Sequence, residues 1–179
     1  ERGRQASSYI PTTTNTVTRN GDTLRRSISR EASKSQGTYL IRCPDFPIFQ
    51  EAFYNYILFL TDAEASSGAG WLGVGFSFST SGVVSLMLRT ATDGDLISVA
   101  LPPSRLSGEM NLGLSYSEGS LIVTLNGVSY TADTQQSLEG ASFLKLFSGS
   151  TQSTVIATCS SLTYAPVAAT SAELEELTK

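Results

Sequence analysis

The stretch that decides the fold is residues 111–133, NLGLSYSEGSLIVTLNGVSYTAD. Apolar residues alternate with small or polar ones over 112–116 and again over 121–125, which is the pattern of a half-buried strand. Ser-Glu-Gly-Ser, at 117–120, is a turn cluster between these runs. The second run is followed by Asn126-Gly127, the strongest short-range signal of a hairpin, because a type I′ turn needs positive φ at both central residues. The stretch therefore predicts three antiparallel strands in a meander.

The composition of the whole chain agrees with a fold made of strands and turns. The 179 residues suit one domain plus an appendage, and 40% of them are hydrophobic, which is enough for a packed core. The 15 glycines are spread along the chain, as in proteins with many turns. A net charge of -4 argues against a nucleic-acid partner, which needs a clustered basic face. No apolar run approaches the roughly 20 residues that span a membrane, so no membrane insertion is predicted.

Other runs of alternating or branched residues predict further strands on both sides of the meander. They lie at 37–43, 54–62, 71–79, 82–91, 96–101, 142–148 and 155–164. Two segments are ambiguous: residues 23–35 fit a strand or a short basic helix, and the first half of 48–62 also fits a helical turn. Roughly ten to twelve short strands at this spacing predict a sandwich or a barrel.

The last residues change to a helical period. Thr170 and Glu173 have the spacing of a capping box, in which each side chain bonds the other residue's backbone N–H group. Leu174 and Leu177 then fall on one helical face. The sequence predicts a short C-terminal helix whose two leucines pack on the sheet.

Little in the sequence supports catalysis. The chain has no histidine, which excludes Ser-His-Asp and Cys-His nucleophile arrangements and histidine-based zinc sites. Glycoside hydrolysis needs only two facing carboxylates, but the candidate acids fall in predicted turns rather than at alternate positions of one strand. The sequence therefore predicts no enzyme, no catalytic residue and no cofactor. The acids considered are Asp62, Glu64, Asp93, Asp95, Glu109 and Asp133.

The two cysteines, Cys43 and Cys159, are too few for a disulfide framework. Because free cysteines are usually buried, we expect two buried thiols that pack as small apolar residues. Both lie in predicted strands near opposite ends of the chain. They are therefore neighbours if the first and last strands pair.

Five residues are candidates for ligand binding. Trp71, the only tryptophan, would form an aromatic platform for a sugar together with Tyr54 or Tyr56. For Trp71, core packing is nevertheless the preferred interpretation, because tryptophan is usually well buried. Asp93 and Asp95 flank a glycine, and clustered carboxylates of this kind suit calcium. Since Asp-Gly is more often a simple turn, the turn is the preferred interpretation and no metal site is predicted.

Three segments resemble known families. Residues 112–128 resemble the strand pair of laminin-G-like and concanavalin-A-like jelly rolls, in which an acidic-Gly turn and an Asn-Gly-Val sequence follow in this order. Residues 8–22, SYIPTTTNTVTRNGD, resemble a segment that recurs in bacteriophage tail and tail-fibre proteins, where it closes one lectin-like module and leads into the next. Residues 160–178 resemble the ending of such modules, although an Ala-rich spacer replaces the frequent Arg-Leu.

The resemblance implies a fold class and a domain division. The fold would be all-β, a two-sheet antiparallel jelly-roll sandwich of concanavalin A-like or laminin G-like type, with a short C-terminal helix. Residues 1–22 would be the closing strand of a preceding module or a linker between modules. Residues 23–179 would be the lectin-like jelly-roll domain.

The resemblance also implies a function. The chain would be a non-enzymatic module of a phage tail fibre or tailspike that attaches to a glycan or an outer-membrane receptor on the host surface. It would form a homo-oligomer, expected to be a trimer, contact other tail proteins and reside in the virion tail after assembly in the bacterial cytoplasm, where cysteines stay reduced. Two alternatives remain open: a structural spacer or decoration domain of the tail, and a polysaccharide-degrading tailspike domain.

Overall fold

The computed structural model describes residues 24–28, 35–49, 54–62, 70–79, 81–136, 138, 141–149, 155–156 and 158–179. The segment expected to close or link a preceding module, residues 1–22, lies outside these ranges. Most of the regular structure in the described residues is β-strand. The elements in chain order are β1 (Leu24–Ser27), β2 (Gly37–Cys43), β3 (Ile48–Phe49), β4 (Tyr54–Thr61), β5 (Trp71–Phe78), β6 (Val84–Thr90), β7 (Gly94–Ala100), a 3-10 helix η1 (Pro103–Arg105), β8 (Met110–Ser117), β9 (Ser120–Leu125), β10 (Val128–Asp133), β11 (Phe143–Gly149), β12 (Val155–Ile156), β13 (Ser161–Ala165) and α1 (Ser171–Leu177).

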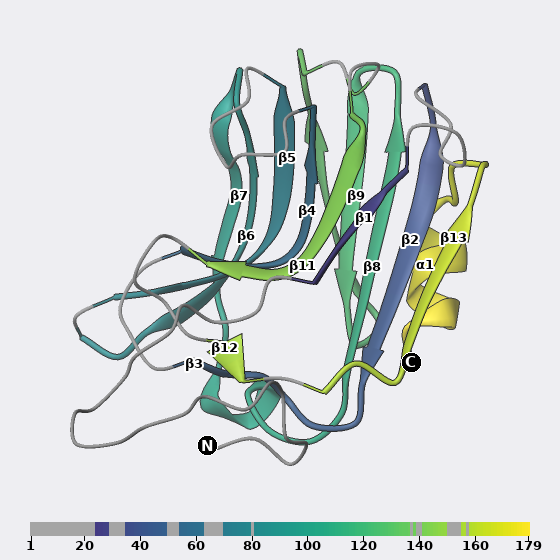
Figure 1. Cartoon of the computed structure of the whole chain (residues 1–179). Coiled ribbons are helices and arrows are strands. Elements are labelled where there is room, and N and C mark those ends of the chain that lie inside the picture. The colour runs from purple at the N-terminus through teal and green to yellow at the C-terminus, as the bar shows by residue number, and fades with distance from the viewer. Residues whose placement is uncertain are drawn as a thin grey trace, which may run out of the picture.

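The strands form two sheets that pack face to face (Figure 1). The six-stranded sheet has the order β1-β11-β4-β5-β6-β7, and the five-stranded sheet has the order β10-β9-β8-β2-β13. Neighbouring strands are antiparallel, and a separate two-stranded ribbon pairs β12 with β3. This arrangement confirms the predicted all-β, two-sheet antiparallel jelly-roll sandwich with a short C-terminal helix.

The core lies between the two sheets and is built from alternate residues of the facing strands. Leu72, Val74 and Phe76 of β5 are buried there, as are Leu112 and Leu114 of β8. Successive side chains of a strand point to opposite faces, so the residues between these positions face outward. The alternation therefore decides which side chains the two outer faces carry.

The meander predicted from residues 111–133 is confirmed as β8, β9 and β10. Asn126 and Gly127 have φ values of 46° and 75°, as the type I′ turn requires. The Asn126 side chain also holds the start of β8, because its Oδ1 accepts a hydrogen bond from the Asn111 N–H (2.7 Å) and its Nδ2 donates one to the Glu109 carbonyl (3.0 Å). This turn thus joins β9 to β10 and also ties them to the start of β8.

Two expectations about strand boundaries are wrong. Residues 155–164 do not form one closing strand, because β12 pairs with β3 whereas β13 pairs with β2. β12 thus belongs to the two-stranded ribbon and β13 to the five-stranded sheet. The sequence could not predict this division, because alternation reveals which face of a strand is buried but not which strand it pairs with. In addition, β7 begins at Gly94 rather than at Leu96. Within the two ambiguous segments, residues 24–27 and 48–49 are strands rather than helix.

The C-terminal helix is capped as predicted. Thr170 Oγ1 accepts a hydrogen bond from the Glu173 N–H (3.3 Å), and a Glu173 carboxylate oxygen accepts one from the Thr170 N–H (2.8 Å). Leu174 is fully buried against the outer face of the five-stranded sheet. Leu177 is 44% exposed, so the expectation that both leucines pack is wrong. The contacting stripe is instead Leu174 and Thr178, four residues apart, and Thr178 Oγ1 accepts a hydrogen bond from the Gly127 N–H (3.1 Å).

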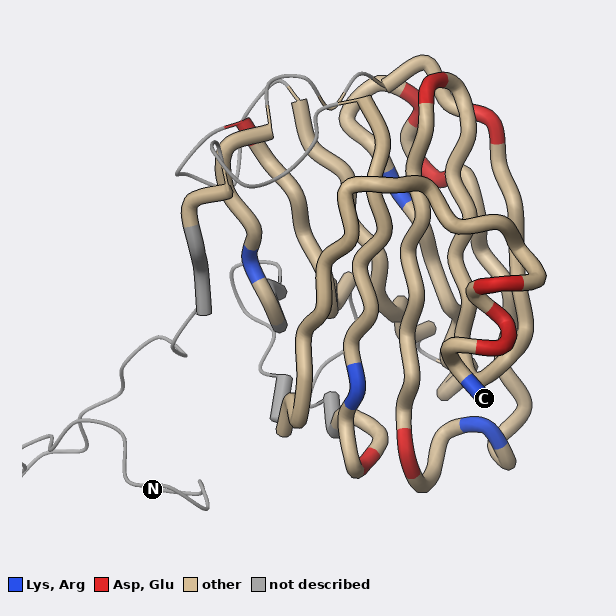
Figure 2. Tube along the Cα trace, turned by 90° about the vertical axis from the view of Figure 1, so that its right-hand side faces the viewer, with Lys and Arg blue, Asp and Glu red and all other residues tan. Residues whose placement is uncertain are grey.

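The outer face of each sheet has its own character. The six-stranded sheet bends away from the five-stranded sheet, so its outer face is concave (Figure 1). Viewed from the side of the five-stranded sheet, the strands carry few charges, and lysine, arginine, aspartate and glutamate lie mainly at turns and strand ends (Figure 2).

No helix in the described part of the chain is long and apolar enough to cross a membrane.

Candidate functional site

The concave face, defined as the outward residues of β4, β5, β6 and β7, carries a cluster of aromatic rings. Phe59 and Trp71 stack with ring centroids 5.4 Å apart, and Tyr56 contacts both, at 5.0 Å from Phe59 and 6.0 Å from Trp71. Phe59 is buried, whereas Tyr56 and Trp71 are half-buried. These three residues, the aromatic cluster, place a partly exposed apolar surface outside the core between the sheets.

Two glycines of β5 make room for this cluster. A Cβ atom on Gly73 would lie 2.4 Å from Cδ1 of the Tyr56 ring, and one on Gly75 would lie 1.9 Å from the Asn55 carbonyl oxygen. The pairing of β4 with β5 shifts register between Tyr56 and Leu58, which is a β-bulge or a similar irregularity. Gly73 therefore lets the Tyr56 ring lie across β5, and Gly75 lets the backbone approach at the irregularity.

Arg89 of β6 joins the aromatic residues to the neighbouring strand. Its guanidinium carbon lies 3.9 Å from the centroid of the Tyr54 ring, and its Nη1 donates a hydrogen bond to the Tyr56 hydroxyl (3.4 Å). Its Nε pairs with a carboxylate oxygen of Asp95. Burial raises the pKa of Tyr56, and the nearby Arg89 only partly offsets this, so the hydroxyl stays protonated at neutral pH. The arginine is thereby held over the Tyr54 ring with its charge balanced by Asp95.

A pocket of about 400 Å³ lies beside Tyr54 on the same face. Three serines from three adjacent strands line it: Ser77, Ser85 and Ser98. We call this pocket the serine trough. Ser77 and Ser85 are direct cross-strand partners, and the buried Met87 opposite Ser98 also lines the pocket. The complete lining is Tyr54, Ser77, Phe78, Ser79, Val83, Ser85, Met87, Asp95 and Ser98. The pocket thus combines an aromatic ring, several hydroxyl groups and one carboxylate.

Four of the five candidate ligand-binding residues lie together on the concave face. Trp71, Tyr54, Tyr56 and Asp95 come from β4, β5 and β7, which the sheet brings side by side. The preferred interpretation of Trp71, packing in the core, is wrong, because its ring lies outside the core cluster and stacks on Phe59. Sequence reasoning missed the serine trough, although the outward position of each serine is readable from the alternation of its strand.

Asp93, the fifth candidate, lies at the turn between β6 and β7. Its carboxylate accepts hydrogen bonds from Thr134 Oγ1 (2.6 Å), Thr90 Oγ1 (3.1 Å) and the Gln135 N–H (3.1 Å). The Thr134 hydroxyl, followed by the other donors, holds the pKa of Asp93 below its ordinary value. Asp93 therefore connects the six-stranded sheet to the segment that follows β10. Among the described residues, no three Asp, Glu, Cys or His side chains group as metal ligands would.

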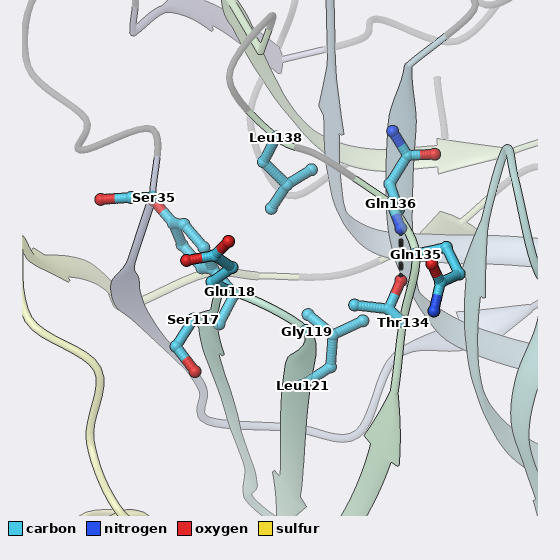
Figure 3. Close-up of a pocket in the computed structure, with 10 residues that line it drawn as sticks. Ser35, Ser117, Glu118, Gly119, Leu121, Thr134, Gln135, Gln136 and Leu138 are labelled. Carbon is cyan, nitrogen blue, oxygen red and sulfur yellow. Dashed lines mark hydrogen bonds between the residues drawn. The ribbon is translucent and has the colours of Figure 1, made fainter.

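A second pocket, of about 420 Å³, lies at the rim where the β8–β9 turn meets the residues after β10 (Figure 3). Glu118 lies on one side of it and Thr134 on the other, with Leu121 and Leu138 contributing apolar surface (Figure 3). Thr134 Oγ1 also accepts a hydrogen bond from the Gln136 N–H (2.9 Å), which fixes this wall. Ser117 and Gln135 add further polar groups to its lining, so the rim pocket is a second candidate site.

Acidic residues are scarce on the strands of the six-stranded sheet. The sequences of β1, β4, β5, β6, β7 and β11 contain one acidic residue, Asp95. Asp95 is paired with Arg89. Glycoside hydrolysis by a pair of carboxylates needs two acids facing the same sugar bond. The strands of this sheet therefore supply one of the two required groups.

Comparison with known proteins finds similarity of fold. No protein-family model matches the chain, and no curated protein sequence matches it. A solved domain of an extracellular GH43 arabinanase from Geobacillus stearothermophilus, in complex with arabinotriose, superposes with a TM-score of 0.59 at 15% identity, covering 84% of this chain and 69% of that one. The CBM40 domain of a Ruminococcus gnavus sialidase gives a TM-score of 0.53 at 16% identity, covering 87% and 92%.

A viral protein is also among the similar structures. Tailspike protein 2 of the Escherichia coli O157:H7 bacteriophage CAB120 gives a TM-score of 0.60 at 14% identity, covering 86% of this chain but only 23% of the tailspike. At these identities the similarity establishes the jelly-roll fold and not the ligand. The residues of the concave face must therefore carry the argument about function.

Proposed function

We propose that this domain is a non-catalytic carbohydrate-binding module whose ligand lies in the serine trough against Tyr54. The observation that carries the proposal is the combination, in one pocket, of an aromatic ring with hydroxyls from three strands and a carboxylate. Sugars present an apolar face and a ring of hydroxyl groups. A pocket that offers one apolar wall and several short polar groups is complementary to both.

The balance of charge favours a neutral sugar. Arg89 and Asp95 form an ion pair, so together they add no net charge to the pocket. The serine hydroxyls donate or accept hydrogen bonds, and the Asp95 side chain, 46% exposed, can accept from a sugar hydroxyl. Met87 and Tyr54 provide apolar contact. The site thus suits hydroxyl groups better than a carboxylate or a phosphate.

The finer proposal is that the module belongs to a bacteriophage tail fibre or tailspike and attaches the virion to a host-surface polysaccharide or an outer-membrane receptor. It is supported by the resemblance of residues 8–22, 112–128 and 160–178 to phage tail modules. The fold similarity to a tailspike is further support. In this role several copies act together, as a homotrimer beside other tail proteins, and weak single sites then add up to strong attachment.

A structural spacer or decoration domain in the tail is the second candidate function. The observation that favours it is a set of exposed apolar side chains near the C-terminus, of which Val167 is 58% exposed. A spacer would bury this surface against a neighbour and would leave the serine trough empty. The third candidate, polysaccharide degradation, has only Asp95 as an acid on the strands of the six-stranded sheet.

The test is binding of the full chain to an array of bacterial surface polysaccharides and neutral oligosaccharides, followed by isothermal titration calorimetry with each positive sugar. Tyr54→Ala should weaken binding about tenfold, because it removes the stacking surface. Ser85→Ala should weaken it about three- to tenfold, because it removes one hydrogen bond.

The matched control is Glu118→Gln in the rim pocket, which should leave the affinity unchanged. If Glu118→Gln weakens binding while Tyr54→Ala does not, the ligand site is the rim pocket. If the folded protein binds no sugar on the array, the structural spacer is favoured. Release of reducing sugar during incubation would favour the degrading enzyme.

A further inference from the structure

Cys43 and Cys159 meet at one end of the sandwich. Cys43 ends β2, and Cys159 lies just before β13, the edge strand that pairs with β2. The backbones are already aligned there, because the Ser160 N–H donates a hydrogen bond to the Arg42 carbonyl (2.8 Å). The Cys159 thiol donates a hydrogen bond to the Ser161 carbonyl (3.2 Å), and the two thiols are close enough for each to shift the pKa of the other. The expected adjacency of the two cysteines is thus confirmed, and both are free thiols in this structure.

The two thiols differ in access to solvent. Cys43 is fully buried in the core, whereas Cys159 is only partly buried. Burial raises the pKa of the Cys43 thiol to about 12, and burial also raises the pKa of Cys159. Both are therefore protonated at neutral pH, and Cys159 is the thiol that a reagent in solution reaches first.

We propose that Cys43 and Cys159 are a disulfide-forming site whose oxidant is a low-molecular-weight disulfide such as oxidised glutathione. The Cys159 thiolate attacks one sulfur of glutathione disulfide, forms a mixed disulfide and releases one glutathione thiolate. The Cys43 thiolate then attacks Cys159 Sγ, forms the protein disulfide and releases the second glutathione thiolate. Two protein thiols are oxidised, one glutathione disulfide is reduced, and the two protons pass to the glutathione thiolates.

The bond would secure the last elements of the fold. β13 is an edge strand held by one neighbour, β2, and the chain that follows it carries α1. A covalent link between Cys43 and Cys159 closes a loop that contains most of the domain, and such a loop strongly restricts the unfolded chain. The oxidised protein should therefore melt about 10 °C higher than the reduced protein.

The experiment incubates the folded full chain with oxidised glutathione at mildly alkaline pH. The expected product is a chain with no free thiol and no covalent link to a second chain, a mass lower by two hydrogens and a peptide map that links Cys43 to Cys159. The rate of its formation should rise about tenfold per pH unit, because the thiolate is the attacking species. The melting temperature should return to its original value after reduction.

The control is Cys159→Ser, which is placed at the more accessible position because Cys43 belongs to the core. This variant should gain no internal bond and no stabilisation from oxidised glutathione. The proposal is overturned if the wild-type protein keeps two free thiols after prolonged incubation. It is equally overturned if the bond links two chains, or forms only in denaturant.

Discussion

Asp93 does more than form the Asp-Gly turn that the sequence predicts. The turn is present, since Gly94 has φ of 73°. The carboxylate, however, also accepts hydrogen bonds from two threonine hydroxyls and a backbone N–H, and two of these donors lie more than forty residues away in the chain. A short-range signal therefore located the turn but not the long-range contacts that Asp93 makes.

These contacts predict a pH dependence of stability. The donors, Thr134 first, lower the pKa of Asp93 in the folded state below its ordinary 3.8. Near that pH the unfolded chain binds more protons, so the stabilisation by Asp93 is fully present above about pH 4 and is lost as the pH falls through the folded-state pKa. Asp93→Ala should lower the free energy of unfolding by about 1 kcal/mol at pH 7, because solvent screens this carboxylate, and by less at pH 3.

Urea denaturation of both proteins at pH 7, 5 and 3 measures this difference. Asp95→Ala is a useful comparison, because Asp95 is paired with Arg89 on the concave face instead of holding the turn. A difference between wild type and Asp93→Ala that stays constant down to pH 3 would contradict the assignment of the stabilisation to the carboxylate.

At the scale of elements, α1 is stabilised by its contact with the sheet more than by its own length. A helix of seven residues is too short to be stable alone. Leu174 is completely buried, whereas Leu177 is largely exposed on the same short helix. Substituting Leu174 and Leu177 in turn therefore separates the contribution of packing to stability from that of helix propensity.

Leu174→Ala should lower the free energy of unfolding by about 2–4 kcal/mol, because it leaves a cavity at the contact of α1 with the five-stranded sheet. Leu177→Ala should change it by less than about 0.5 kcal/mol, because the side chain is exposed. Chemical denaturation of the two variants provides the measurement. Equal costs at the two positions would show that α1 does not dock as described.

What could be predicted from the sequence also depends on the element. The turn at Asn126 and Gly127 was predictable because its conformation depends on two adjacent residues. The break between β12 and β13 was not, because it depends on which strands the chain meets there. Similarly, alternation places Ser77 and Ser98 outward, but only the strand order brings them into one pocket with Tyr54.

The whole molecule carries a net charge of -4, yet the proposed sugar pocket is close to neutral because Arg89 and Asp95 are paired. Binding of a neutral sugar by hydrogen bonds and stacking releases few counterions. The dissociation constant should therefore change by less than about threefold between about 0.05 and 0.5 M NaCl. Titration calorimetry at these salt concentrations tests this, and a steep loss of affinity with salt would identify an anionic ligand.

The position of α1 has a consequence for how the domain is displayed. α1 packs on the outer face of the five-stranded sheet, and the C-terminus lies on that side of the sandwich, whereas the concave face belongs to the other sheet (Figure 1). A chain anchored to a surface through Lys179 would therefore turn the serine trough outward, away from its support. Attachment through the C-terminus orients every copy the same way and leaves the pocket accessible.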